Sequence, residues 1–190
     1  MTIIGRALGF MGGVGIPKVY TTWDPANKDA GITLSGSNLI ATNAANNQDV
    51  RSTIGKSSGK WYWELTFSAT AGVLEGVVNA SASMSATLSG ANAWAYNSPD
   101  GHSFNNSVYA AYGAAYGAGD TIGLALDMDA GTLTAYKNNA SQGTMSTGLT
   151  GTMYAAHGLA SASILSVTAN FGASAFTYTP PGGYNAGLYN

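Results

Sequence analysis

The chain has 190 residues, no cysteine and a formal net charge of −2. The lack of cysteine excludes disulfides and thiolate metal sites. The seven Lys and Arg residues are scattered without a basic run, which argues against the dense cationic face that nucleic acid requires. Charged residues make up 8% of the chain, which suits a subunit packed into an assembly, or an extracellular or virion protein, better than a free cytosolic enzyme.

The first 20 residues are apolar and Gly-rich, and we predict that they form an arm outside a single domain of residues 21–190. A secretory signal needs an uninterrupted apolar stretch after a basic start. Glycines and Arg6 interrupt that stretch here, so we predict no signal peptide. No later segment reaches about 18 consecutive apolar residues, so no membrane span is expected either.

Residues 61–67 (WYWELTF) have the alternating pattern of a β-strand. Trp61, Trp63, Leu65 and Phe67 share one face, and the residues between them point to the other. A period of two over this length predicts a strand with one buried face.

Residues 121–127 and 132–137 have the same alternation and are separated by the turn sequence Met-Asp-Ala-Gly. Gly131 supplies the positive φ that a tight turn needs. We expect Asp127 to accept backbone N–H bonds in an Asx-type turn rather than to bind a metal ion. The two segments therefore predict an antiparallel hairpin.

Residues 164–171 predict a further strand, with Leu165, Val167 and Phe171 facing inward. No stretch has a sustained helical period with caps, and the Ala-rich residues 109–118 contain glycines that disfavour a helix. Short strands between Gly, Ser and Asn turns indicate an all-β fold in which two antiparallel sheets pack as a sandwich.

Three of these segments carry longer motifs. They are residues 59–64 (GKWYWE), residues 119–138 (with GDTIG, LD, GTL and YKN) and residues 170–172 (NFG), which Gly183 and Tyr184 follow. Because all three stand in the family's order and spacing, the chain resembles a SPRY domain from about Trp23 to Tyr184.

Within that family the chain is most similar to bacteriophage-type members, which are virion- or tail-associated. This resemblance rests on the Ala-, Ser- and Gly-rich composition and on the sequence of residues 22–28 (TWDPANK). Ala135 stands where the family usually has a large aromatic residue, and Asn139 stands where a turn glycine is common. We therefore expect the core near Ala135 to be smaller or differently filled.

The resemblance implies a bent, concanavalin-like sandwich of two antiparallel sheets. It also implies binding of other proteins through loops at one end, with no catalytic residue and no cofactor. No ligand-binding residue carries over, because the binding loops differ between family members.

Residues suited to catalysis or metal binding are sparse. A nucleophilic triad needs a base, and we expect both histidines, His102 and His157, to lie in loops or at the surface. Asp127 and Asp129 lack the further acidic residues of a calcium loop. Two histidines without cysteine argue against a zinc site. We therefore predict no catalytic, cofactor-binding or metal-ligating residues.

Residues 94–106 hold the richest mixture of aromatic and amide side chains, a combination typical of binding surfaces. Trp94 and Phe104 can equally be core residues beside a hairpin. Loops at residues 42–49 and 69–76 complete the predicted recognition end, where Glu75 is either a ligand contact or a solvated charge. The candidate ligand-binding residues are Trp94, Tyr96, Asn97, Asp100, His102, Asn105, Asn46, Asn47 and Glu75.

The arm has two interpretations. It is either a disordered tail or a docking segment that inserts into a neighbouring subunit, with glycines that let the backbone bend. The candidate docking residues are Ile3, Ile4, Leu8, Phe10 and Met11.

Together these features predict a non-enzymatic bacteriophage virion protein, made in the host cytoplasm and joined to other virion proteins by its arm. The displayed sandwich would be a tail fibre or receptor-binding component that recognises a host-surface protein or glycan. A capsid or tail decoration protein is the alternative, and a polysaccharide-degrading enzyme is a more remote one. Low charge favours a homo-oligomer, with a trimer as one possibility.

Overall fold

The computed structural model describes residues 17–70, 72–85, 88–161 and 163–190, which form two sheets without any helix among them. The first sheet consists, in spatial order, of β1 (Trp23–Lys28), β4 (Gln48–Lys56), β13 (Met153–Leu159), β6 (Val73–Asn79), β7 (Ala93–Asn97), β8 (His102–Asn105) and β9 (Val108–Ala111). The second consists of β12 (Ala140–Ser146), β11 (Thr132–Lys137), β10 (Thr121–Asp127), β5 (Lys60–Phe67), β14 (Leu165–Asn170), β3 (Ile40–Asn43) and β2 (Thr33–Ser35). A short strand, β15 (Asn185–Ala186), pairs parallel to β5.

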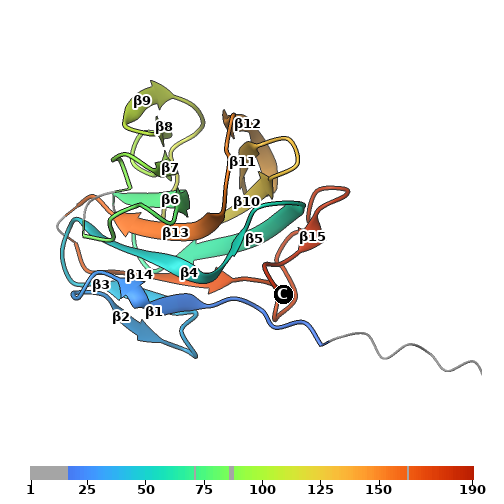
Figure 1. The fold of residues 1–190 in the computed structure, drawn as a ribbon. Coiled ribbons are helices and arrows are strands. Elements are labelled where there is room, and N and C mark those ends of the chain that lie inside the picture. Colours follow the sequence, from blue (N-terminus) through green and yellow to red (C-terminus); the bar gives the residue numbers. More distant parts are fainter. Residues whose placement is uncertain (1–16, 71, 86–87, 162) are drawn as a thin grey trace, which may run out of the picture.

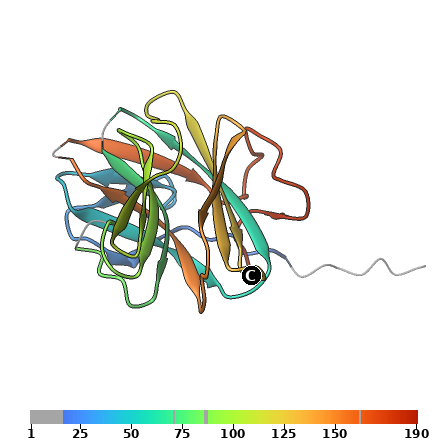
Figure 2. The ribbon, with the colours of Figure 1, turned by 90° about the horizontal axis from the view of Figure 1, so that it is seen from above.

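All strand pairs except the one between β15 and β5 are antiparallel, and the predicted two-sheet sandwich is confirmed. Figure 1 shows β7 to β9 and β10 to β12 rising from the plane of the other strands, so the sandwich is bent. Figure 2, viewed from above, shows these two groups side by side. The predicted strand at residues 61–67 and the predicted hairpin coincide with β5 and with β10 and β11.

The main core lies between the two sheets. Trp63 and Leu65 of β5 and Leu124 of β10 enter it from the second sheet, and Val77 and Tyr96 enter it from the first. Burial of this alternating apolar set is the main force that holds the sheets together.

The outer face of the first sheet carries a second, smaller apolar cluster. Leu74, Val78 and Ala156 lie on it and are covered by Leu88 from the long connection between β6 and β7. The first sheet is therefore buried on both faces over its central strands, and Leu74 of this outer cluster also lines the pocket described below.

The second face of β5 is also buried at Tyr62 and Glu64, although Thr66 is exposed, so the prediction of a half-buried strand was wrong over most of that side. Glu64 is 2% exposed and accepts hydrogen bonds from the backbone N–H groups of Thr177 at 2.7 Å and Tyr178 at 2.9 Å. The chain after β14 thus folds back over β5. Beneath it, a Cβ at Gly123 would overlap the Tyr62 ring, so only glycine fits in that motif position.

The turn between β10 and β11 is fastened by Asp127. Its Oδ1 accepts the N–H groups of Asp129 and Ala130, both at 3.0 Å, which confirms the predicted Asx-type turn. Its Oδ2 pairs with Lys60 Nζ at 2.9 Å. Burial works against ionisation, but the Lys60 contact and these hydrogen bonds hold the pKa of Asp127 below its ordinary value. Two of the motifs found in the sequence therefore stabilise each other.

The two ends of the described chain lie together. Tyr20 forms an antiparallel bridge with Tyr189, and the N–H of Asn190 donates to Val19 O at 3.1 Å. The arm residues Ile3, Ile4, Leu8, Phe10 and Met11 lie outside the described residues, so their predicted docking role stays a prediction.

Asp49 is the least well compensated acid in the domain. It lies on the outer face of the first sheet, is 0% exposed, and neither carboxylate oxygen has a hydrogen bond of normal length among the described residues. Burial, with a smaller contribution from Asp29, raises the pKa of Asp49 to about 9, although the backbone of Leu88 opposes the shift. Folding therefore takes up a proton at neutral pH.

Replacing Asp49 by Asn should change the pH dependence of stability. The unfolded carboxyl ionises near its ordinary pKa of 3.8 and the folded one near 9, so wild-type stability should fall progressively as pH rises between those values. The neutral amide should remove that decline and make the variant more stable by about 1 kcal/mol or more at pH 9. Urea denaturation from pH 4 to pH 9 measures both curves, and parallel curves would contradict the expectation.

Candidate recognition site

A pocket of about 740 Å³ opens on the outer face of the first sheet, at the end where β6 begins and β7 ends. Its floor is apolar, with Leu74 from β6 and Phe104 from β8. No charged side chain lines it. The lining residues are Thr70, Gly72, Leu74, Ser89, Asn97, Pro99, Phe104, Tyr109, Ala160, Ser161 and Ser163.

One wall of the pocket is an aromatic stack on the β8–β9 hairpin. The Tyr109 ring lies parallel to His102, with centroids 4.5 Å apart, and also contacts Phe104 at 4.7 Å. Tyr109 remains 49% exposed. A ring that is held by two neighbouring rings and is still half exposed can pack against a ligand at little cost in conformational entropy.

Asp100 holds this wall in place. It accepts hydrogen bonds from the Tyr109 hydroxyl, from Asn97 Nδ2 at 2.7 Å and from the His102 N–H at 3.0 Å. Partial burial opposes ionisation, but these hydrogen bonds lower the pKa of Asp100. The carboxylate therefore stays ionised at neutral pH and gives the rim a negative charge.

Three of the predicted binding residues lie together beside this pocket: Asn97 lines it, whereas Asp100 and His102 contact the wall residue Tyr109 from behind the lining. His102 was expected in a loop or at the surface, but it begins strand β8 (His102–Asn105). The turn before β8 brings Asp100 within hydrogen-bond distance of Asn97 and His102.

Trp94, Tyr96 and Asn105 do not face the pocket. Trp94 is partly buried against the main core, and Tyr96 is 0% exposed, with its hydroxyl bonded to Ala114 O. Asn105 bonds Met145 O and Ser146, which ties β8 to β12. The prediction that Tyr96 offers its ring to a ligand was wrong, because the main core encloses it.

Asn46 and Asn47 are exposed in the turn between β3 and β4. The Asn47 N–H donates to Leu159 O at 2.7 Å, so this turn lies beside the chain that enters the pocket wall at Ala160. Both side chains border the recognition end without lining the pocket.

Glu75 and His157 were placed wrongly by sequence reasoning. Both are 0% exposed, because they lie on the adjacent central strands β6 and β13 and point into the main core. His157 Nδ1 lies 2.6 Å from Glu75 Oε1, and Nε2 lies 2.7 Å from Asn43 Oδ1 on β3. Burial raises the pKa of Glu75, although His157 opposes the shift. Glu75 is therefore no ligand contact but part of a polar link between the sheets.

Leu74 and Pro99 were not named as candidates, but they lie in the segments 69–76 and 94–106 that were expected at the recognition end. Tyr109 and Ser161 were missed. Tyr109 lies in an uncharged run with Val108, and both are exposed in the structure. Ser161 comes from a distant segment, and only the sheet order brings it to the pocket.

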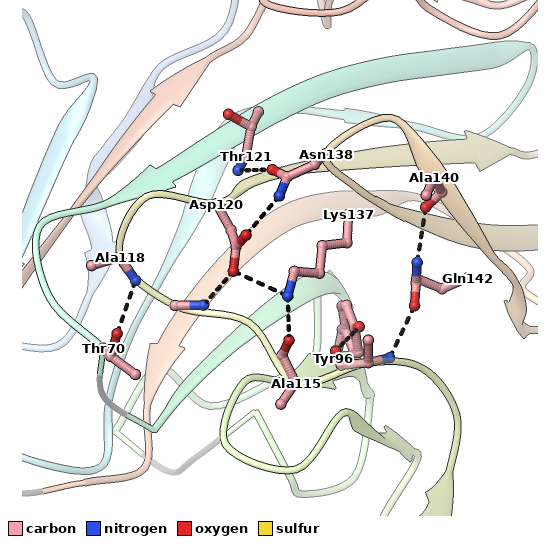
Figure 3. A network of polar contacts seen from close by, with 12 residues as sticks. Thr70, Tyr96, Ala115, Ala118, Asp120, Thr121, Lys137, Asn138, Ala140 and Gln142 are labelled. Atoms are coloured by element: carbon pink, nitrogen blue, oxygen red, sulfur yellow. Dashed lines mark hydrogen bonds and ion pairs between the residues drawn. The ribbon is translucent and has the colours of Figure 1, made fainter.

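The connection from β9 to β10 is anchored by the family-like motifs (Figure 3). Asp120 accepts hydrogen bonds from Asn138 Nδ2 at 2.7 Å and from the Gly117 N–H at 3.0 Å, and it pairs with Lys137 Nζ at 3.3 Å. Lys137 also donates to Ala115 O at 2.6 Å. This network fixes the chain that supports the β8–β9 hairpin.

A family model described as SPRY domain matches residues 60–173, which is more than half of the chain. The chain belongs to the SPRY domain family. The networks around Asp120 and Asp127 show that the SPRY motifs serve the scaffold, and SPRY domains as a family are protein–protein interaction modules. A search of curated proteins found no match to the chain.

Solved structures share the SPRY fold at low sequence identity. The SPRY domain of human HERC1 is 18% identical with a TM-score of 0.67, and the match covers 77% of this chain and 96% of that one. The TRIM65 PSpry domain is 18% identical with a TM-score of 0.66, covering 80% and 92%. Stonustoxin is 23% identical with a TM-score of 0.63, covering 85% of this chain and 30% of the toxin chain.

The departure at Ala135 lies inside the main SPRY core. Ala135 is 0% exposed, and the Tyr112 hydroxyl lies 3.0 Å from its backbone nitrogen. Tyr112 packs against the same core from the connection after β9. An aromatic residue from a neighbouring segment thus lies beside the small side chain.

Within the described residues, no set of three His, Cys, Asp or Glu side chains is arranged to hold a metal ion. The same part of the chain contains no helix of the length and hydrophobicity that crossing a bilayer requires.

Replacing Asp100 by Asn should change the titration of Tyr109. The hydrogen bond to the Asp100 carboxylate raises the pKa of Tyr109 above its ordinary value of 10.0, and a neutral amide should let it fall back. An NMR pH titration of the Tyr109 ring measures the shift. Asp129→Asn, which removes a carboxylate from a different turn, should leave Tyr109 unchanged, and equal titration in wild type and Asp100→Asn would refute the assignment.

Proposed function

We propose that this SPRY domain is a non-enzymatic binding module of a bacteriophage particle, a tail fibre or other receptor-binding component. The pocket beside Tyr109 is the recognition site in this proposal. The single observation that carries the binding role is an apolar pocket of about 740 Å³ with an exposed aromatic wall already fixed in place. Such a wall can pack against a protein side chain or stack on a sugar ring.

The virion setting is supported by the sequence. Charged residues are 8% of the chain, so copies repel one another weakly and can be packed densely. In the proposal, the protein is made in the host cytoplasm and its apolar Gly-rich arm joins it to other virion proteins. The described residues next to the arm do not line the pocket: residues 19–20 pair with residues 189–190, and none of these four belongs to the pocket lining.

Tyr109→Ala should weaken host adsorption at least about tenfold, the cost expected for an aromatic residue at the centre of an interface. Particles carrying the variant are compared with wild type in an adsorption assay. Val19→Ala is the matched control, since Val19 is also exposed, at 64%, but lies by the chain ends. Trp94 and Tyr96 are unsuitable for this test because both contact the main core.

The outcome also separates a receptor-binding component from a decoration protein. Lost adsorption with particles of normal heat stability supports receptor binding. Normal adsorption with particles that fall apart at lower temperature supports decoration and contradicts the proposed role of the pocket.

Changing Ile4 and Phe10 to Ser should reduce incorporation into particles without lowering the thermal stability of the purified protein. The reason is that apolar docking depends on the area that these side chains bury. Immunoblots of purified particles measure incorporation, and Thr2→Ser serves as the control. Wild-type incorporation of the double variant would remove the arm from the proposal.

A further inference from the structure

The two sheets end in four edge strands, β1, β9, β12 and β2, and three of them carry features that block the addition of another strand. β1 contains Pro25 and Lys28 and has an irregular register. β12 pairs with two register shifts, and β2 has only three residues. Proline, lysine, bulges and short length are the devices by which proteins protect sheet edges.

Strand β9 is also short, with four residues, but it has no proline, no lysine and no register shift. It reads Val-Tyr-Ala-Ala, all four residues are exposed, and its register with β8 is regular throughout. It lies at the free end of the first sheet (Figure 1). An uncharged, regular and exposed edge is a template for pairing with another strand.

The hairpin geometry shows which backbone groups of β9 are free. Asn106 and Ser107 form a two-residue turn with φ of 50° and 75°, so the flanking pair, Asn105 and Val108, exchanges hydrogen bonds. Pairs then alternate, and Tyr109 and Ala111 direct their N–H and C=O groups away from β8. The same alternation holds in β8, where Asn105 bonds toward β9 and the next residue, Asn106, donates its N–H toward β7, to Ala93 O at 2.9 Å. Among the described residues, nothing bonds the outward groups of Tyr109 or Ala111.

We propose that β9 pairs antiparallel with β9 of a second copy of this chain, across a twofold axis at Ala110. Tyr109 of each copy then lies opposite Ala111 of the partner subunit, and each such pair exchanges two backbone hydrogen bonds. A large ring faces a small side chain in both pairs, and the two Ala110 methyl groups meet at the axis. No like charges are opposed, because β9 carries none.

This pairing joins the first sheets of two copies into one continuous sheet. The axis of an antiparallel pair stands perpendicular to the sheet, so both outer faces look the same way. Tyr109 belongs to the pocket wall, and therefore Ala111 of the partner subunit lies at the rim of each pocket. The interaction goes beyond the proposed recognition role and holds whatever the pocket binds.

Sedimentation velocity of the full chain, from about 1 µM to about 1 mM, tests the pairing over the range of weak protein association. The wild type should shift from monomer to dimer. Ala111→Pro should stay monomeric across this range, because proline removes an outward donor without breaking a bond to β8. Ala111→Ser keeps the N–H and a small side chain and should dimerise like wild type.

A second variant guards against a local effect of proline. Ala110→Lys puts two positive charges face to face at the axis and should also abolish the dimer, with recovery in high salt. Circular dichroism confirms that each variant is folded. A wild type that stays monomeric at the highest concentration overturns the proposal. So does association that both Ala111→Pro and Ala110→Lys leave intact, since the arm or another surface would then be responsible.

Discussion

Burial of both faces of β5 is the constraint around which this domain is arranged. One face packs Trp63 and Leu65 between the sheets, and the other places Glu64 where it accepts hydrogen bonds from the Tyr62 hydroxyl and from two backbone N–H groups of the returning chain. A buried carboxylate without such donors would be costly. The segment after β14 must therefore cross β5. β14 pairs with the second half of β5, and β15 pairs with Trp61 and Tyr62 in the first half. The lysine at the start of β5 pairs with Asp127, which extends the same constraint to the β10–β11 hairpin.

Residue alternation was enough to predict β11 and β14, whose two faces differ in burial, and also β5 and β10, whose second faces are buried but carry polar or small residues. It was insufficient where both faces are apolar, as in β6, because the period of two then disappears. Glu75 shows this clearly, since it stands in a run that is apolar on both sides (VLEGVV), and a polar residue there suggested a loop. Its buried state depends on His157, 82 positions later, and on Asn43 across the sandwich. No local pattern contains that pairing.

The recognition end was predictable only in part, for a related reason. Asn97, Asp100 and His102 belong to one hairpin, so a cluster in the sequence became a cluster in space. Leu74 lies in the segment 69–76 that was expected at the recognition end, whereas Ser161 reaches the pocket only because β6 lies between β13 and β7 in the sheet. The position of a strand in a sheet is set by long-range packing and not by its own residues, so the contribution of Ser161 was not predictable from the sequence.

Because the two ends of the described chain lie side by side, such a domain can be connected to other protein segments at a single point. A unit that enters and leaves at one point, with Tyr20 bridged to Tyr189, occupies little more room in a host polypeptide than a surface loop would. It can be spliced into a longer protein without stretching its neighbours, and its sequence order can be rotated by joining the ends and cutting elsewhere.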